Sequence, residues 1–239
     1  MYSISEWDTK HFGFSVAKWN PESVTEIENT VYTKDKLVIS RVNQTNTEVI
    51  EELQFRNFRI YDTLITYRLK LKDRLYPIIL ETENTEYDYV LKAPVEPQLE
   101  KLGLDIFTNF TSHWFTDKLI SKNKALKIYT NWIQNTYKEP SNELVDMAFS
   151  ITNRTPSGFY ILKWEEPKIL NVSLIGVTPM YRRSNLYTNL MNLLLDTAED
   201  TEASDVLYGT QAVNLVPFIV LPRFGFKPFK VEYTFHRWN

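Results

Sequence analysis

The alternation of strand-like and helix-like segments constrains the fold of this 239-residue chain more than any other feature. Residues 12–19, 36–42 and 59–71 have the short apolar or alternating patterns of β-strands. The stretches between them, 21–34 and 45–56, begin with Pro or Thr/Asn and carry apolar residues at helical spacing. The first 70 or so residues therefore predict a small layered β-α-β-α-β unit.

The rest of the chain repeats this logic on a larger scale. Helical spacing is followed by three strands separated by short turns, then by helix, strand, helix and strand. The predicted elements are helices 97–109 and 123–139, strands 144–152, 157–164 and 168–177, helix 187–200, strand 205–211, helix 212–224 and strand 230–238. The sequence thus predicts an α/β fold with a binding site where a strand runs into a helix.

A change in composition separates the two parts. Pro77, Pro94 and Pro97 surround a stretch of mixed charge, which is typical of a linker followed by a strand near residues 87–93. We expect an N-terminal α/β unit over residues 1–80 and a second domain over residues 81–239.

Composition excludes several functional classes. The chain has no Cys, which removes disulfides, thiolate zinc sites and a cysteine nucleophile, and its three scattered His make a metal site hard to build, so no metal is expected. Lys and Arg (27) and Asp and Glu (30) are interspersed, giving a net charge of −3 and no basic stripe for nucleic acid. No leader pattern opens the chain, and no stretch approaches the roughly 18 apolar residues of a membrane span. We expect a cytoplasmic protein with neither nucleic-acid nor membrane partners.

The stretch VTPMYRRSNLYTNLM (177–191) joins a predicted strand to a predicted helix. The first turn of a helix carries unpaired backbone N–H groups and a partial positive charge, so it favours phosphate, and Arg182 and Arg183 add charged donors. The alternative is that the double Arg is only a solvated connector.

This stretch resembles the acyl-CoA motif of the GNAT superfamily, V-x-P-x-[YW]-[RQ]-x-x-G-x-[GA]-x-x-L-[LM]. The matching residues are Val177, Pro179, Tyr181, Arg182, Leu190 and Met191, while Asn185 and Tyr187 replace the two glycines. Residues 210–228 resemble the second signature of the superfamily, with matches at Asn214, Gly225 and Phe226 and with Pro217 and Leu221 in place of its Ala and Tyr.

The N-terminal segment ISEWDTKHFGFSVAKW is similar to the opening of bacterial enzymes that acylate dTDP-linked amino-dideoxy sugars, and HWFTD and VEYTFHRW look like later parts of them. The resemblance implies a GNAT-like mixed central sheet with flanking helices. It also implies transfer of acetyl or 3-hydroxybutyryl from acyl-CoA to a dTDP-linked 3- or 4-amino-dideoxyhexose, for cell-surface polysaccharide synthesis. The enzyme would be a monomer or a homodimer.

Site residues follow from the same resemblance. The backbone N–H of Gly176 or Val177 would bind the thioester oxygen, and Leu221 stands where the family has a Tyr that protonates the thiolate. The residues expected to bind CoA are Ile175, Arg182, Arg183, Ser184, Asn185, Leu186, Tyr187 and Asn214. The residues expected to bind the sugar nucleotide are Trp7, Asp8, His11, His113 and Trp114. Here the reason lies in the residues themselves, because Trp7 and Trp114 each stand within a few residues of a His and an Asp, a mixture typical of a site wall.

The departures from the motif lead to further expectations. Asn185 should adopt the left-handed backbone of the lost glycine, and the ring of Tyr187 should point away from the phosphates. Leu221 would wall the acyl pocket and favour a chain longer than acetyl. Other candidates are Tyr187 or Tyr233 as acid and His11 or His113 as base. Two alternatives stay open: acylation of another small amine, or a GNAT-like binding protein without catalysis.

Overall fold

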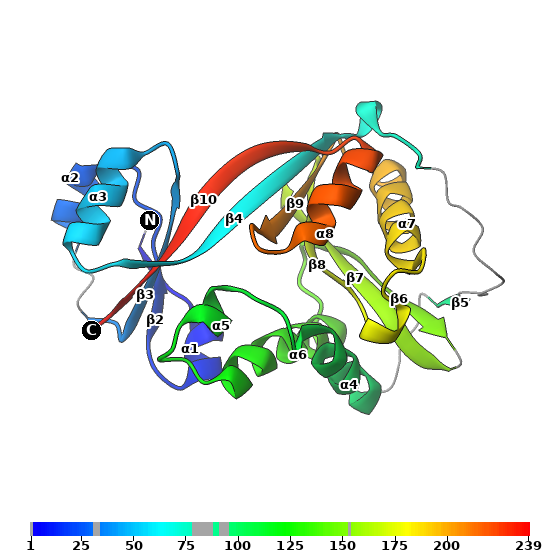
Figure 1. The fold of residues 1–239 in the computed structure, drawn as a ribbon, viewed down its shortest axis with the longest axis horizontal. Helices are drawn as coiled ribbons and strands as arrows, with labels where there is room; N and C mark the ends of the chain where they lie inside the picture. The colour runs from blue at the N-terminus through cyan, green and yellow to red at the C-terminus, as the bar shows by residue number, and fades with distance from the viewer. Residues whose placement is uncertain (1, 31–33, 78–87, 91–95, 153) are drawn as a thin grey trace.

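A computed structural model describes residues 2–30, 34–77, 88–90, 96–152 and 154–239. Its described strands form one mixed ten-stranded sheet in the order β1-β2-β3-β10-β4-β9-β8-β7-β6-β5 (Figure 1). The strands are β1 (Ser3–Ile4), β2 (Val16–Lys18), β3 (Leu37–Asn43), β4 (Arg59–Lys70), β5 (Asp88–Val90), β6 (Leu144–Thr152), β7 (Thr155–Glu166), β8 (Ile169–Val177), β9 (Asp205–Gln211) and β10 (Lys227–Trp238).

Helices cover both faces of this sheet. The α-helices are α1 (Glu6–Phe12), α2 (Val24–Asn29), α3 (Thr47–Phe55), α4 (Glu96–Phe107), α5 (His113–Thr116), α6 (Lys122–Lys138), α7 (Leu186–Asp200) and α8 (Leu215–Val220). Three short 3-10 helices, η1 (Leu71–Asp73), η2 (Pro179–Tyr181) and η3 (Leu221–Phe224), lie in the connections. Each longer helix buries an apolar stripe against the sheet, which is what its spacing predicts.

Three hydrophobic clusters define the layers. Helices α1, α4, α5 and α6 pack on one face with Phe159 and Ile161 of β7, whereas α7 packs on the opposite face with Tyr160 and Leu162. In the N-terminal part α2 and α3 form a third cluster with strand residues that include Val38. Because successive strand residues point to opposite faces, this alternation gives the sheet a helix layer on each side.

Most predicted elements are confirmed, including the meander of β6, β7 and β8. The prediction of a strand over residues 12–19 is wrong at its start, because Phe12 ends helix α1 and the strand covers only Val16–Lys18. Pro97 lies in the first turn of α4 rather than in a linker, a position where Pro removes no intrahelical hydrogen bond.

The predicted boundary between residues 80 and 81 falls outside the described residues. The sheet nevertheless joins the two sides of it. Strand β10, the last in the chain, lies antiparallel between β3 and β4, and β4 also pairs with β9. In Figure 1, β4 and β10 run side by side from the N-terminal part into the C-terminal part.

Strands β8 and β9 separate partway along their length. They pair in parallel from Ile169 and Asp205 only as far as Val172 and Tyr208, although β8 continues to Val177. A bulge accompanies the separation, since Val172 opposes Leu162 in β7 while Leu174 opposes the adjacent Ile161. A bulge bends its strand and increases the local twist, so the two strands diverge and open a wedge in the sheet.

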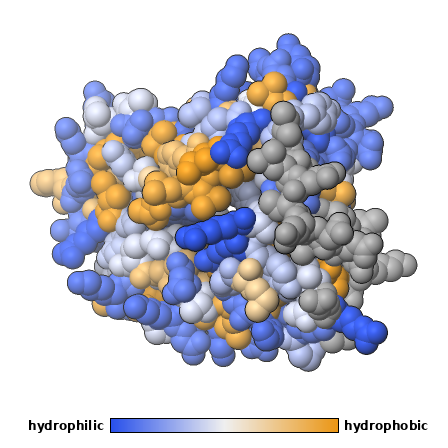
Figure 2. Space-filling view, turned by 45° about the vertical axis from the view of Figure 1, so that its right-hand side comes forward, coloured by the Kyte–Doolittle hydropathy of each residue, from blue (hydrophilic) through white to orange (hydrophobic). Residues whose placement is uncertain are grey.

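Exposed apolar side chains gather on and just before α8, at Val213, Leu215, Val216 and Ile219. Figure 2 shows hydrophobic areas among hydrophilic surroundings on the face that it draws. Of the helices in the described part of the chain, none combines the length and the apolar character that crossing a membrane would require.

Candidate functional site

A cavity of about 930 Å³ opens where β8 and β9 diverge. Residues 173–175 of β8 and 209–211 of β9 line its inner wall. These are the residues that follow the last β8–β9 pair, so the wedge itself forms part of the cavity. The volume lies within the range of pockets that hold small molecules.

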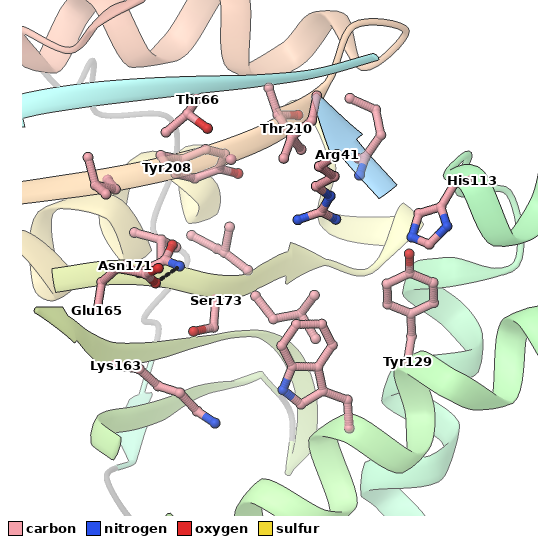
Figure 3. Close-up of a pocket in the computed structure, with 18 of the residues that line it drawn as sticks. Arg41, Thr66, His113, Tyr129, Lys163, Glu165, Asn171, Ser173, Tyr208 and Thr210 are labelled. Atoms are coloured by element: carbon pink, nitrogen blue, oxygen red, sulfur yellow. Dashed lines mark hydrogen bonds between the residues drawn. The ribbon is translucent and has the colours of Figure 1, made fainter. Parts of the chain in front are cut away.

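The N-terminal part and the α5–α6 segment supply the outer walls of this cavity. Trp7, Lys18 and Arg41 contribute from the first 43 residues, and Trp114 and Trp132 contribute aromatic surface. Figure 3 shows the guanidinium group of Arg41 pointing into the space between the wedge and the His113–Tyr129 wall. Aromatic planes beside cations suit a ligand that has flat apolar faces and an anionic group.

Six of the residues expected from the sequence to bind substrate or CoA line this one cavity: Trp7, Asp8, His113, Trp114, Ile175 and Asn214. The carboxylate of Asp8 is buried, accepts a hydrogen bond from Ser5 and pairs with Lys18 at 2.6 Å. Asp8 therefore fixes Lys18 at the cavity wall. The roles of all six toward a ligand stay predictions.

His11 lies outside the residues that line the cavity. Its Nε2 is 2.8 Å from the backbone oxygen of Lys124, its Nδ1 is 3.2 Å from the amide nitrogen of Asn131, and its ring stacks on Trp7. These contacts connect α1 with α6. The structure thus gives His11 packing contacts, among them the stacking on Trp7, which lines the cavity.

The loop between β8 and α7 is held by its own polar groups. The Arg182 guanidinium donates hydrogen bonds to the backbone oxygens of Ile106 (3.1 Å) and Val177 (3.4 Å), which joins the loop to α4. The Ser184 hydroxyl donates to the Tyr181 oxygen and accepts from the Leu186 N–H, while the Leu186 side chain is fully buried. Leu186 can therefore offer a ligand only its backbone.

The expectation for Asn185 is wrong. Asn185 has φ −76° and ψ 1° and is the N-cap of α7, whereas Arg183 takes the left-handed conformation with φ 68°. The chain reverses two residues earlier than the glycine of the motif suggests. A left-handed Arg costs roughly 1 kcal/mol relative to Gly, and the Ser184 bonds on either side of the helix start help to hold it.

Tyr187 packs against the hydrophobic core on the α7 side of the sheet, and its orientation relative to a bound phosphate stays a prediction. Its hydroxyl lies 2.8 Å from the hydroxyl of Tyr208, which lines the cavity. Burial raises the pKa of Tyr208 to about 12 and raises the pKa of Tyr187 further above its ordinary value. Both hydroxyls therefore stay protonated at neutral pH. Tyr233 packs with the cluster around α2 and α3.

Leu221 is fully buried in the core beneath α7 and is not among the described residues that line the cavity. The expected acyl wall at Leu221 therefore does not form here. Gly176 and Val177 pair with Phe159 and Gly158 of β7. A Cβ at Gly176 would lie 2.6 Å from a methyl group of Ile106, so only glycine lets α4 pack so closely.

A buried chain of side chains ends at the cavity. The Asp117 carboxylate accepts hydrogen bonds from Nδ1 of His236 (2.7 Å) and from the Trp238 indole (2.8 Å). Nε2 of His236 is 2.8 Å from Nδ1 of His113, which lines the cavity. Sequence reasoning missed Asp117 and His236. The alternation of Thr234, His236 and Trp238 on one face of the last strand was the available signal.

Burial controls the protonation states of Asp117, His236 and His113. Burial, together with the neighbouring His236, Arg41 and Lys18, holds the pKa of His113 well below its ordinary value. Burial also lowers the pKa of His236, although Asp117 opposes the shift. Burial alone would raise the pKa of Asp117, but hydrogen bonds from His236, Trp238 and Leu119 lower it. At neutral pH the chain therefore consists of two neutral imidazoles and one carboxylate.

Among the described residues, no cluster of three or more His, Asp or Glu side chains is arranged to hold a metal ion.

No protein-family model matches this sequence, and no curated protein matches it. Solved structures resemble the chain at low identity. A GCN5-related N-acetyltransferase from Sphaerobacter thermophilus has a TM-score of 0.59 and 11% identity over 90% of this chain and 63% of that chain. One from Kribbella flavida has a TM-score of 0.56 and 12% identity over 93% and 80%.

A tandem GNAT protein from the clavulanic acid biosynthesis pathway has a TM-score of 0.57 and 12% identity over 84% of this chain and 64% of that chain. The chain thus spans less than two thirds of this protein and of the Sphaerobacter protein. At such identities the likeness concerns architecture alone. The mixed sheet of this chain with its flanking helices has the fold of the GCN5-related N-acetyltransferases.

Proposed function

We propose that the protein transfers an acyl group from acyl-CoA to an amine. The observation that carries the proposal is the wedge, where β8 and β9 diverge after Val172 and Tyr208 into a cavity that also reaches Asn214. Diverging strands leave backbone amides without a neighbouring strand, and the pantetheine arm of CoA carries amides that can pair with them.

The N-terminus of α7 is the proposed site for the CoA pyrophosphate. This helix has fifteen residues and no acidic residue in its first turn, so its N–H groups and dipole favour an anion. Arg183 adds a cation at the turn, whereas Arg182 serves mainly to join the loop to α4. The exposed apolar surface at Leu215 and Val216, beside Asn214, suits the apolar part of the pantetheine arm.

Acyl transfer needs the thioester carbonyl next to a donor and the amine next to the carbonyl. We assign the donor to a backbone N–H in residues 173–177 of β8, within which Gly176 and Val177 remain the candidates from the motif. The bulge between Val172 and Leu174 supports an opening of the strand that begins at Ser173. The amine then approaches from the side of Arg41 and His113.

For the acceptor we propose a dTDP-linked 3- or 4-amino-dideoxyhexose, with acetyl or 3-hydroxybutyryl as the acyl group and cell-surface polysaccharide as the destination. Trp7 and Trp114 offer aromatic surface for thymine or the sugar, and Arg41 offers a cation for the diphosphate. The size of the cavity, about 930 Å³, supports an acceptor much larger than a simple amine.

Two measurements test this function in sequence. Titration calorimetry with CoA tests the binding site, and we expect one site per chain. Thiol release is then followed with acetyl-CoA or 3-hydroxybutyryl-CoA and dTDP-3-amino-3,6-dideoxygalactose, with the matching dTDP-6-deoxyhexose that lacks the amine as control. Release that depends on the amine supports the proposal. Absence of CoA binding overturns it, while binding without release from this sugar or from other amines limits the protein to CoA binding.

A further inference from the structure

The Asp117–His236–His113 chain is arranged to fix the position of protons. A carboxylate can only accept, so His236 must carry its proton on Nδ1, which faces Asp117 at 2.7 Å. In a neutral imidazole the other nitrogen then accepts, so His236 Nε2 receives the proton on Nδ1 of His113 across 2.8 Å. Nε2 of His113 is consequently left unprotonated, with a lone pair.

Nε2 of His113 makes no hydrogen bond to any group in the described ranges. The other three ring nitrogens of His113 and His236 each make one. The side chain of His113 belongs to the cavity wall, beside Tyr129 and facing Arg41 (Figure 3). Tyr129 uses its hydroxyl to donate to Ser112 at 2.8 Å. The free lone pair of the chain is therefore offered on the amine side of the proposed site.

From this geometry, and on the basis of the proposed function, we propose that His113 is the base that deprotonates the acceptor amine and that His236 and Asp117 are its positioning residues. The amine binds as an ammonium group and gives a proton to Nε2 of His113. The proton on Nδ1 of His113 then moves to Nε2 of His236, so that the positive charge rests beside the Asp117 carboxylate.

The remaining steps balance this transfer. The lone pair of the neutral amine forms a C–N bond to the thioester carbon, and the carbonyl π pair moves to oxygen. When that pair returns, the C–S bond breaks, the thiolate leaves and it takes up the second proton lost by the nitrogen. The amide and the free thiol of CoA are the products, and the proton held by the histidine pair passes to solvent.

The charged and titratable groups around the pair favour proton acceptance only in part. Arg41 and Lys18 disfavour a cation at His113, while Asp62 accepts a hydrogen bond from the His113 backbone N–H. The ring of Tyr61 stacks on His236 at 4.6 Å, and Tyr129 adjoins His113. Asp117 is the one carboxylate among the described side chains that hydrogen-bonds to either imidazole. The positive charge of the protonated pair is therefore most stable on His236, beside Asp117.

The resting state can be tested without any substrate. Nitrogen-15 NMR of the full-length protein at neutral pH should show both His113 and His236 as neutral Nδ1–H tautomers. Because the protein has only three histidines, their signals can be assigned. A His113 protonated on Nε2 would overturn the proposal whatever the activity, because that nitrogen would then have no lone pair to offer.

Kinetics test the base itself. We expect His113→Ala to lower kcat about 10²- to 10⁴-fold with a smaller change in KM. Imidazole in the buffer should restore part of the rate, because the removed side chain leaves a space that opens into the cavity. The rescue should grow with the concentration of neutral imidazole. An active wild-type enzyme whose His113→Ala variant keeps its rate within about threefold at every pH would overturn the proposal.

His236→Gln tests the positioning role. Without His236 the proton taken up by His113 can no longer pass to the nitrogen beside Asp117, so we expect kcat to fall. Because His236 is one of the groups that lower the pKa of His113, the acidic limb of the pH–rate profile should move to higher pH. Thr234→Val is the matched control, because it lies on the same strand, is fully buried and has a hydroxyl without a hydrogen-bond partner among the described residues. If the acidic limb of the pH–rate profile is unchanged in His236→Gln, His236 has no positioning role toward His113. A wild-type protein that transfers no acyl group would instead count against the proposed function, with the tautomers still measurable.

Discussion

At the scale of single residues, Leu221 stands where the motif that this sequence resembles has a Tyr, and it is buried away from the cavity. The hydroxyl of Tyr208, in contrast, belongs to a residue that lines the cavity. Tyr208 belongs to the last β8–β9 pair, where the strands begin to separate, and its hydroxyl lies 2.8 Å from that of Tyr187. The pKa of Tyr208, about 12, exceeds the roughly 8.5 of an ordinary thiol, so full proton transfer to the thiolate would be uphill.

Tyr208 can still donate a hydrogen bond to the departing sulfur. A hydrogen bond to a charged group contributes about 1.5–3 kcal/mol, so we expect Tyr208→Phe to lower kcat about tenfold to a hundredfold. Steady-state thiol release measures this effect. Tyr67→Phe is the control, because Tyr67 lies directly opposite Tyr208 on β4 and is equally buried. Equal rates in the two variants would leave Tyr208 without a role in leaving-group departure.

At the scale of elements, the proposed pyrophosphate site at the start of α7 can be tested by adding a charge there. Asn185 is the N-cap of α7 without a side-chain capping hydrogen bond, and a carboxylate is favourable near a helix N-terminus, so Asn185→Asp should leave the thermal stability nearly unchanged. The added negative charge would face a pyrophosphate at a few ångströms, at about 1 kcal/mol for each pair of charges in water. We therefore expect CoA affinity to fall at least about fivefold, with a smaller effect at high salt.

Calorimetry with CoA checks this prediction, and Asn123→Asp is the matched control. Asn123 lies in the first turn of α6, so the control adds the same charge at the start of another helix. If both variants bind CoA as the wild type does, the pyrophosphate does not lie at α7.

The elements that the sequence predicted are those with a clear hydrophobic period. The stripe of α6 stands out because most of its buried residues are apolar, and β10 stands out through the alternation of Val231, Tyr233 and Phe235, although Thr234 and His236 are buried as well. Helix α1 was not predicted because one of its two buried residues is Asp8, which does not contribute to a hydrophobic pattern. The left-handed turn went to Arg183 rather than Asn185 because local hydrogen bonds, and not intrinsic preference, fixed where the chain reverses.

The candidate site was only partly predictable for a related reason. Trp7, His113 and Trp114 were suggested by their mixed polar and aromatic surroundings, and they do line the cavity. The contact between Asp117 and His236 joins residues 119 apart in the chain. No local spacing reports such a contact, because it exists only once β10 enters the middle of the sheet.

At the scale of the whole molecule, the buried histidines predict how stability depends on pH. His113 and His236 have lowered pKa values in the folded chain, whereas unfolded histidine takes up a proton near pH 6.5. The unfolded state thus binds more protons below that pH, and stability falls as the pH decreases, by up to about 1.4 kcal/mol per pH unit for each histidine.

Asp62 acts in the opposite direction. Burial raises its pKa to about 6, so its carboxyl protonates in the folded state first and adds stability as the pH falls from about 6 toward 4. One carboxyl can offset at most one of the two histidines. We expect the urea midpoint to fall between pH 7 and pH 5, with a shallower slope in His236→Gln. A midpoint that rises over this range would contradict neutral, buried histidines.

The continuous sheet predicts that the two halves of the chain depend on each other. Both neighbours of β10, namely β3 and β4, come from the first 80 residues, although β10 itself is the last strand. A fragment of residues 81–239 would leave both edges of β10 unpaired and would expose Phe235, which is fully buried in the whole chain. We expect this fragment alone to lack a fixed tertiary structure and to bind no CoA, because β4, the strand that joins β10 to β9, is missing from it.

Co-expression of residues 1–80 with residues 81–239 is the matched control, since it restores every strand pair while keeping the same cut. Dispersed amide signals in NMR and CoA binding should return in the complex but be missing from the fragment. A fragment that folds and binds CoA by itself would instead support two independent domains, with β10 able to form without its neighbours.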